Sequence, residues 1–224
     1  ATITLTNVTF TGYSGTSTNA AIYVNIASGT MVINVSGGTI PSIRTAGATV
    51  TVESPVTFTV TVKDLETGLV IPNARVMVPV TSGANFPYQA SVTITSSGTT
   101  ATVTHTGHGR ATNDNILIAG ANEDDYNGAF TITKIDANSY SYTMLGDPAN
   151  TATGTITATI VLLNGLTGDP SGVITDSRTY TAAQPVSGWV RKATGSPLYR
   201  QAPVADTVSN TNGLSVTVFL QPDE

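Results

Sequence analysis

Apolar residues alternate with threonine or other small polar residues in short runs along most of this chain, and this alternation limits the folds open to it. Residues 3–10 and 56–62 are two such runs, ITLTNVTF and VTFTVTV. A period of two residues is typical of a strand with one buried face. Threonine and valine add to this preference because β-branched side chains pack well on a pleated surface. The sequence therefore predicts an all-β protein.

The composition excludes several classes of protein. The chain has 224 residues, of which 40% are hydrophobic and 10% are charged, so it has the apolar content of a folded protein. Its net charge of -5, with nine Lys and Arg, supplies no basic stripe for nucleic acid. No apolar run reaches the length of a membrane-spanning helix, and the absence of cysteine excludes disulfides and thiolate metal sites. We therefore expect neither nucleic acid nor a membrane as a partner.

Residues 1–52 form the first predicted segment. The runs ITLTNVTF, AIYVNI and MVINV are separated by glycine-, serine- and asparagine-rich turns. The stretch LTNVTFTG resembles a rung of a right-handed β-helix, in which Asn and Thr ladders and a buried Phe repeat on each coil. One or two rungs cannot bury a face alone. The segment is therefore predicted to be β-helix-like, as the last rungs of a solenoid, or more simply to belong to a sandwich of jelly-roll type.

A second motif follows at residues 62–76, with the pattern V-x-D-x-x-T-G-x-x-I-x-x-A-x-V. It resembles the immunoglobulin-like modules of bacterial and phage surface proteins. The resemblance implies two neighbouring strands joined by an acidic turn, in which the Thr67-Gly68 pair needs a residue tolerant of positive φ.

The rest of such a module is expected within about ten residues, but a different pattern intervenes from residue 86 to residue 163. The sequence after it, SGVITDSRTYTAAQPVSGWVRKATG and onward, has the strands that the module still lacks. The predicted domains are therefore an N-terminal β segment (1–52), a split immunoglobulin-like sandwich (53–85 plus 164–224) and an inserted small β module (86–163). Chain topology permits the split when an insertion sits at a loop tip.

The insert resembles a small all-β module that recurs in phage and prophage structural proteins. The residues that carry the resemblance are His108-Gly109, Asn113-Asp114, Gly120, Tyr126-Asn127-Gly128, Thr131-Ile132-Thr133, Asp136-Ala137-Asn138 and Tyr140-Ser141-Tyr142. The resemblance implies that the His-Gly pair closes a turn after a strand.

Both histidines of the chain lie in the insert, three residues apart. A neutral His108 imidazole can bond a backbone group in such a turn, while Gly109 adopts a φ that a Cβ forbids. His105 and His108 are expected to point to opposite faces of a strand, because positions three apart do so. We therefore predict a structural turn and no metal site.

Other candidate chemistry is sparse. Glu123, Asp124 and Asp125 carry oxygen ligands, but no EF-hand loop surrounds them, so a solvated acidic turn is predicted. The sequence contains no nucleophile elbow, no zinc-binding His-Glu-x-x-His and no glycine-rich phosphate loop. We expect no catalytic residue, no cofactor and no enzymatic activity.

Trp189, Arg191, Tyr199 and Arg200 are the candidate interface or ligand residues. Aromatic side chains and arginine together are typical of interface hot spots and of sugar-stacking platforms. Trp189 alternates with Val190 on a predicted strand, which favours a half-buried position beside the core, with a subunit contact as the next reading.

Together the two resemblances imply a non-enzymatic structural protein of a tailed-phage virion, in capsid decoration or associated with the tail. Its partners would be other virion proteins or copies of itself, and its location would be the extracellular particle. The N-terminal strands, which carry no charge before Arg44, are expected to make much of the contact. The alternative is a glycan-binding or adhesin module of a secreted or surface protein, in which Trp189, Tyr199 and the tyrosines of the insert stack on a host-surface glycan.

Overall fold

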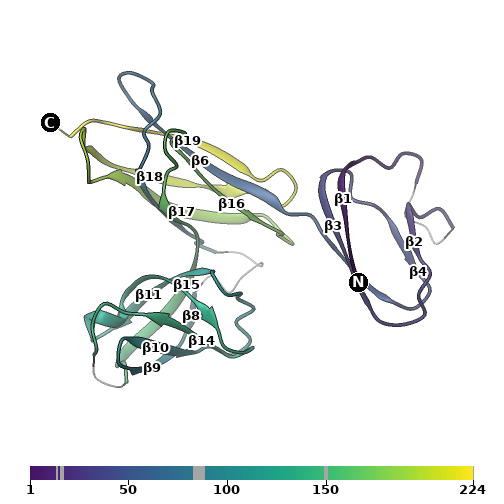
Figure 1. Cartoon of the computed structure of the whole chain (residues 1–224), viewed down its shortest axis with the longest axis horizontal. Helices are drawn as coiled ribbons and strands as arrows, with labels where there is room; N and C mark the ends of the chain where they lie inside the picture. The colour runs from purple at the N-terminus through teal and green to yellow at the C-terminus, as the bar shows by residue number, and fades with distance from the viewer. Residues whose placement is uncertain (14, 16–17, 83–88, 149–150, 224) are drawn as a thin grey trace. The chain divides into compact units, whose positions relative to one another are not determined.

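The computed structural model describes residues 1–224 except 14, 16–17, 83–88, 149–150 and 224. Its regular elements are β-strands and one 3-10 turn, which confirms the all-β prediction. Contacts divide the chain into two compact units, residues 1–57 with 177–180 and residues 58–176 with 181–224 (Figure 1). Among the residues described, no helix has the length and apolar character that a membrane span requires.

The N-terminal unit is a stack of parallel coils. Its strands are β1 (Thr2–Val8), β2 (Ile22–Val24), β3 (Thr30–Gly38), β4 (Ile43–Thr45) and β5 (Thr49–Glu53). One sheet has the order β1-β3-β5 and a second has the order β2-β4, and every pair is parallel. The chain therefore passes from one sheet to the other and back on each coil. Of the two arrangements predicted for this segment, the structure has the β-helix-like one.

Corner residues of successive coils lie above one another. Asn7 has φ of 54° and Gly37, its neighbour in the stack, has φ of 71°. A Cβ on Gly38 would lie 2.1 Å from the Val8 carbonyl oxygen, so this corner requires glycine. Inward-facing Ile33 and Val35 of the middle coil are 0% and 2% exposed. They form the core of the stack, which is too thin to bury the outer coils equally well.

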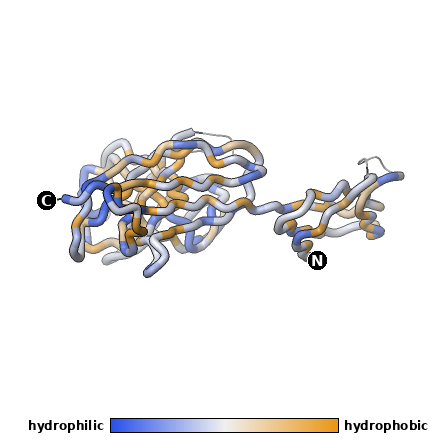
Figure 2. The backbone as a smooth tube through the Cα atoms, turned by 90° about the horizontal axis from the view of Figure 1, so that it is seen from above, coloured by the Kyte–Doolittle hydropathy of each residue, from blue (hydrophilic) through white to orange (hydrophobic). Residues whose placement is uncertain are grey.

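The second unit contains an immunoglobulin-like sandwich. Its strands are β6 (Val56–Asp64), β7 (Arg75–Pro79), β15 (Gly154–Leu166), β16 (Val173–Arg178), β17 (Gln184–Lys192), β18 (Tyr199–Val208) and β19 (Leu214–Leu220). One sheet has the order β16-β6-β19, and the other contains β15-β7-β17-β18. β6 contains the uncharged run VTFTVTV before Lys63 and Asp64, β19 is the uncharged run LSVTVFL, and the two strands pair in parallel. Figure 2 shows hydrophobic and hydrophilic residues interspersed along the chain.

The Thr67-Gly68 turn forms as predicted, because Gly68 has φ of 69°. The two strands of the motif, however, are not hydrogen-bonded neighbours. The chain runs antiparallel to β6 only briefly, where the Ile71 N–H donates to the Val62 carbonyl at 2.8 Å. Asn73, with φ of 59°, then turns the chain into β7 of the opposite sheet. The sequence pattern fixed the turn, whereas the corner after it decided which sheet the second strand joins.

The residues after β7 fold into a small two-sheet module. Its strands are β8 (Gln89–Ser91), β9 (Thr93–Ser97), β10 (Thr100–Thr104), β11 (Asn115–Ala121), β12 (Gly128–Thr131), β13 (Thr133–Lys134) and β14 (Ser139–Thr143). The sheet β13-β14-β10-β9 faces a second sheet made of β12, β11, β15 and β8. Side chains from both sheets share one apolar core, which includes Ile94, Ile116, Tyr126 and Tyr140.

β15 joins this module to the sandwich. It is 13 residues long. Its first half pairs with β8 and β11, and its second half pairs with β7 from Val161 onward, with a register shift between Val161 and Leu163. The predicted domain boundary at residues 163 and 164 thus falls inside a continuous strand. Because β15 belongs to both ladders, the strands of the module's second sheet and of one sandwich sheet form one seven-stranded sheet.

Candidate interaction surfaces

Trp189 and Arg191 lie on the same face of β17. Val186 and Val190 alternate with them and are buried in the sandwich, so Trp189 and Arg191 point away from the core. Trp189 is half-buried, and in the sheet it lies opposite Met77 on β7. The structure therefore places two of the four predicted site residues side by side on the outer face of the sheet.

Arg75 lies on the same face and was not predicted. It is directly opposite Arg191 in the β7–β17 register. Its guanidinium donates to the carbonyls of Val76, at 2.8 Å, and Gly165, at 3.2 Å, and to the side-chain oxygen of Asn164. Burial lowers the pKa of Arg75 from its usual value. No sequence motif marks this residue, because its partners Asn164 and Gly165 come from a strand about ninety residues away.

Tyr199 belongs to the interior and not to this face. It is 6% exposed, and its hydroxyl donates to Asp64 Oδ2 at 2.7 Å. Asp64 Oδ1 also accepts the backbone N–H groups of Glu66 and Thr67 at 2.8 and 2.7 Å. The N–H of Thr67 and the hydroxyl of Tyr199 lower the pKa of Asp64. Burial, then the bond to Asp64, raises the pKa of Tyr199 to about 12. This contact secures the acidic turn to the start of β18.

Arg200, the fourth predicted residue, is exposed and makes an ion pair with Asp223, with 3.1 Å between Nε and Oδ1. The described residues do not assemble the predicted sugar-stacking platform, and Tyr88 of the insert lies outside them. Tyr126, Tyr140 and Tyr142 of the insert are at most 3% exposed, and Tyr142 stacks on Phe130 with ring centroids 4.1 Å apart. Rings buried in the core cannot stack on a glycan.

His108 holds a turn together through both ring nitrogens. The Arg110 N–H donates to Nδ1 at 3.0 Å, and Nε2 lies 2.9 Å from the Asp136 carbonyl. Because Nδ1 accepts and the carbonyl requires a donor, His108 is the neutral Nε2–H tautomer. Gly109 has φ of 60°. The turn therefore has the form that the sequence predicts.

The spacing predicted that His105 and His108 point to opposite faces, and this prediction is wrong. The loop at Gly107, with φ of 63°, folds back and brings the His105 and His108 ring centroids to 5.9 Å. His105 Nδ1 lies 3.3 Å from the Tyr140 hydroxyl. Burial, then the charge of Arg110, lowers the pKa of His105 to about 4. Among the described residues, no group of three His, Cys, Asp or Glu side chains is placed to hold a metal.

The second acidic turn, at Glu123, Asp124 and Asp125, was predicted to be solvated, but its first carboxylate is hydrogen-bonded to the protein. Both Glu123 oxygens accept hydrogen bonds at 2.8 Å from Thr153, one from its N–H and one from its hydroxyl. These bonds lower the pKa of Glu123. Asp124 and Asp125 begin a short 3-10 turn. The Glu123 carboxylate thus binds the loop that precedes β15.

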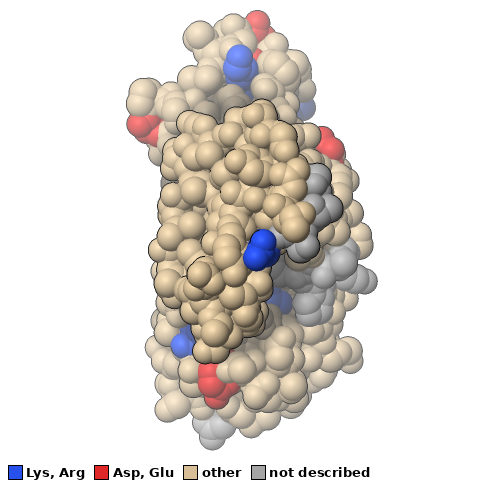
Figure 3. Space-filling view, turned by 90° about the vertical axis from the view of Figure 1, so that its right-hand side faces the viewer, with Lys and Arg blue, Asp and Glu red and all other residues tan. Residues whose placement is uncertain are grey.

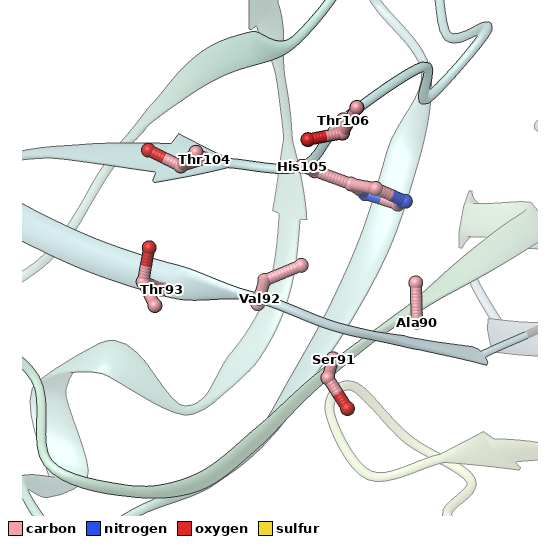
Figure 4. Close-up of a pocket in the computed structure, with 7 residues that line it drawn as sticks. All are labelled: Ala90, Ser91, Val92, Thr93, Thr104, His105 and Thr106. Carbon is pink, nitrogen blue, oxygen red and sulfur yellow. The ribbon is translucent and has the colours of Figure 1, made fainter.

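A pocket of about 480 Å³ lies at the open end of the β9–β10 hairpin (Figure 4). Its lining residues are Ala90, Ser91, Val92, Thr93, Thr104, His105 and Thr106. Figure 4 shows the His105 ring extending between Thr106 and Ala90, whereas the Ser91 hydroxyl points away from it. The polar groups of the pocket therefore do not converge on one position. A specific small-molecule site requires such convergence.

The N-terminal unit has a free sheet edge. In the described part of the chain, β1 pairs with β3 on one side and with no strand on the other, and β2 likewise pairs with β4 alone. Arg44 and Glu53 are the charged side chains of residues 1–57. The face of this unit in Figure 3 is correspondingly almost free of charge. An uncharged free edge presents unpaired backbone groups to a neighbouring chain.

Comparisons with known proteins give distant matches. No family model and no curated protein matches the chain. Among solved structures, it is similar to a doubly substituted shaft pilin SpaA from Lactobacillus rhamnosus GG, with 12% identity and a TM-score of 0.31 over 83% of this chain and 55% of the pilin. It is also similar to the endosialidase of phage phi92, with 12% identity and a TM-score of 0.26 over 70% of this chain and 29% of that protein. The chain thus spans about half of the pilin and less than a third of the endosialidase.

Proposed function

We propose that this chain is a non-enzymatic structural protein of an extracellular particle, specifically of a tailed-phage virion, in capsid decoration or associated with the tail. Its partners are copies of itself or other proteins of the particle. The observation that carries the proposal is the nearly uncharged stack of parallel N-terminal coils, whose outermost strands pair on one side only in the described part of the chain. An unpaired strand edge is a liability in an isolated protein and a binding surface in an assembly.

The rest of the molecule is consistent with a structural role. Its candidate chemical groups are engaged in holding loops, since Asp64, Glu123 and His108 each bind backbone groups of neighbouring turns. In the sandwich, the apolar run of β6 has a strand on each side, β16 and β19, whereas β19 is the last strand of its sheet. The resemblance of the split sandwich and of its insert to phage modules supports the choice of a virion over other extracellular assemblies.

The test is the state of assembly of the purified chain, measured by native mass spectrometry and light scattering across a range of concentrations. We expect oligomers whose population rises with concentration, because repeated weak contacts act together. The same preparation is applied to a glycan array. A chain that stays monomeric at every concentration and binds a glycan would reject the structural role in favour of the glycan-binding alternative.

A further inference from the structure

A row of polar side chains crosses the outer face of the seven-stranded sheet. On β12 the Thr131 hydroxyl donates to Asn115 Oδ1 of β11 at 2.9 Å, and the side-chain amide of Asn164 on β15 donates to the same oxygen at 3.1 Å. Asn164 Oδ1 accepts a hydrogen bond from Arg75 of β7, and Arg191 of β17 lies opposite Arg75. These five residues, called the polar row, lie on successive strands of the sheet. At the ordinary spacing of strands the row is about 19 Å long.

The groups that the polar row leaves available are hydrogen-bond donors. Both amide oxygens of the row already accept hydrogen bonds within it, whereas the Asn115 amide nitrogen has no partner among the described residues. Arg75 uses N–H groups of Nη1 and Nη2 for its three bonds to the protein, which leaves the Nε–H and one Nη2–H. Arg191 is exposed and makes no hydrogen bond or ion pair with a described residue. The row therefore suits a ligand that is rich in acceptors.

The two arginines add a local excess of positive charge. Like charges directly opposite each other destabilise a pair of strands. Within the described residues, no carboxylate makes an ion pair with Arg75 or Arg191. An oxyanion between the two guanidinium groups would offset their repulsion and accept charge-assisted hydrogen bonds from both. The site therefore favours a ligand with an anionic group at this end of the row.

The place of the row in the sheet disfavours a peptide as this ligand. The row crosses interior strands, whose backbone groups are paired within the sheet, so a peptide cannot join as an added strand. Its own N–H groups would meet the donors of the row and remain unsatisfied. A sugar hydroxyl can accept from the row and still donate to water. Trp189, two residues from Arg191 on the same face of β17, offers an aromatic surface to the apolar face of a sugar ring.

We propose that the polar row binds a segment of an acidic polysaccharide that lies across the strands. Its anionic group binds Arg75 and Arg191, its hydroxyls accept hydrogen bonds from Asn115, and a neighbouring sugar ring packs against Trp189. This binding is additional to the proposed assembly role and does not depend on it. Because the chain has a net charge of -5, it has no general attraction for a polyanion, and binding requires this local site.

The first experiment measures binding of the full chain to polygalacturonate by isothermal titration calorimetry, with uncharged dextran as the reference polymer. We expect binding to polygalacturonate alone. Arg191→Gln removes one exposed charge, and we expect it to weaken binding at least about tenfold, because hydrogen bonds to charged groups are the stronger ones. Lys134→Gln removes one exposed charge from β13 of the other sheet and is expected to bind like the parent.

A second experiment changes the donors of the row without changing its shape. In Asn115→Asp, Oδ1 still accepts from Thr131 and Asn164, but a negative charge replaces the amide donors. We expect this variant to bind polygalacturonate at least about tenfold more weakly. Asn212→Asp makes the same substitution at an exposed turn between β18 and β19 and is expected to bind like the parent. Melting temperatures compare the folding of the variants.

The outcomes separate this site from the assembly role. A parent chain that does not bind polygalacturonate, or equal affinities within either pair of variants, would overturn the polar row as a site while leaving the assembly role intact. Equally tight binding of poly-glutamate, which has carboxylates but no sugar hydroxyls, would assign the row to an acidic protein partner and overturn the polysaccharide. Selective loss of polygalacturonate binding in Arg191→Gln and Asn115→Asp, with parent-like melting and unchanged oligomers in native mass spectrometry, supports the proposal.

Discussion

At the scale of single residues, His105 makes the stability of the insert depend on pH. Burial lowers its pKa from 6.5 to about 4. Between these values the unfolded chain binds a proton that the folded chain does not, so stability is complete above pH 6.5 and falls as the pH decreases towards 4. We expect a slope of up to about 1.4 kcal/mol per pH unit for this proton. Urea unfolding of the parent and His105→Gln at several pH values measures it.

The slope assigned to His105 has a clear window. The pKa values of Glu123 and Asp136 are also lowered, but protonation of these two carboxylates reduces the stability only near and below pH 4.5 and 3.8, their usual pKa values. Protonation of His105 therefore dominates the change in stability just below pH 6.5. If His105→Gln keeps the full slope in this window, the assignment to His105 is wrong.

A second residue-scale prediction concerns the bond between Tyr199 and Asp64. Tyr199→Phe keeps the buried ring and removes the hydroxyl that donates to the carboxylate. We expect the melting temperature to fall by about 2–4 °C, because a buried acceptor loses one partner. Tyr13→Phe is the control, since Tyr13 is 53% exposed. Equal melting temperatures for the two variants would show that the bond adds no stability.

At the scale of elements, the stacking of the coils depends on Gly38. Gly38→Ala places a Cβ 2.1 Å from the Val8 carbonyl oxygen and forces the first two coils apart. Gly12 has a similar φ of 81°, but a Cβ there meets nothing within 4 Å. We expect Gly38→Ala to destabilise the N-terminal unit by about 2–3 kcal/mol and Gly12→Ala by about 1 kcal/mol. Chemical denaturation of both variants separates the clash from the cost of positive φ.

At the scale of the whole molecule, we expect the N-terminal unit to be needed for assembly and the second unit to fold without it. A chain that begins at residue 54 retains the strands of the sandwich and of its insert, whose contacts form one compact unit. We expect it to fold, as judged by circular dichroism and a cooperative melt, and to lose the ability to assemble. Assembly of the shortened chain at the parent's concentration would place the contact on the sandwich, where the outer face at Trp189 and Arg191 is the next surface to test.

The sequence by itself determined the features that depend on neighbouring residues. The period of two set the strands, since β6 and β19 alternate buried and exposed residues much as their sequences indicate. Glycine fixed the turns at Gly68 and Gly109, because positive φ is a local requirement. The uncharged N-terminal strands and the His108 turn were predictable because they too depend only on residues that are close in sequence.

The tertiary structure decided everything that depends on which strand meets which. Alternation places a side chain on a face but does not choose the partner strand. The sequence therefore left the stacking of β1 on β3 as one of two alternatives, and it did not predict that β6 and β7 join opposite sheets. Tyr199 was expected at a surface and is buried because Asp64, distant in sequence, accepts its hydroxyl. The free edge of β1 likewise exists only once the coils are stacked. Pairing between distant segments is set by the sum of their packing, which no short stretch of sequence contains.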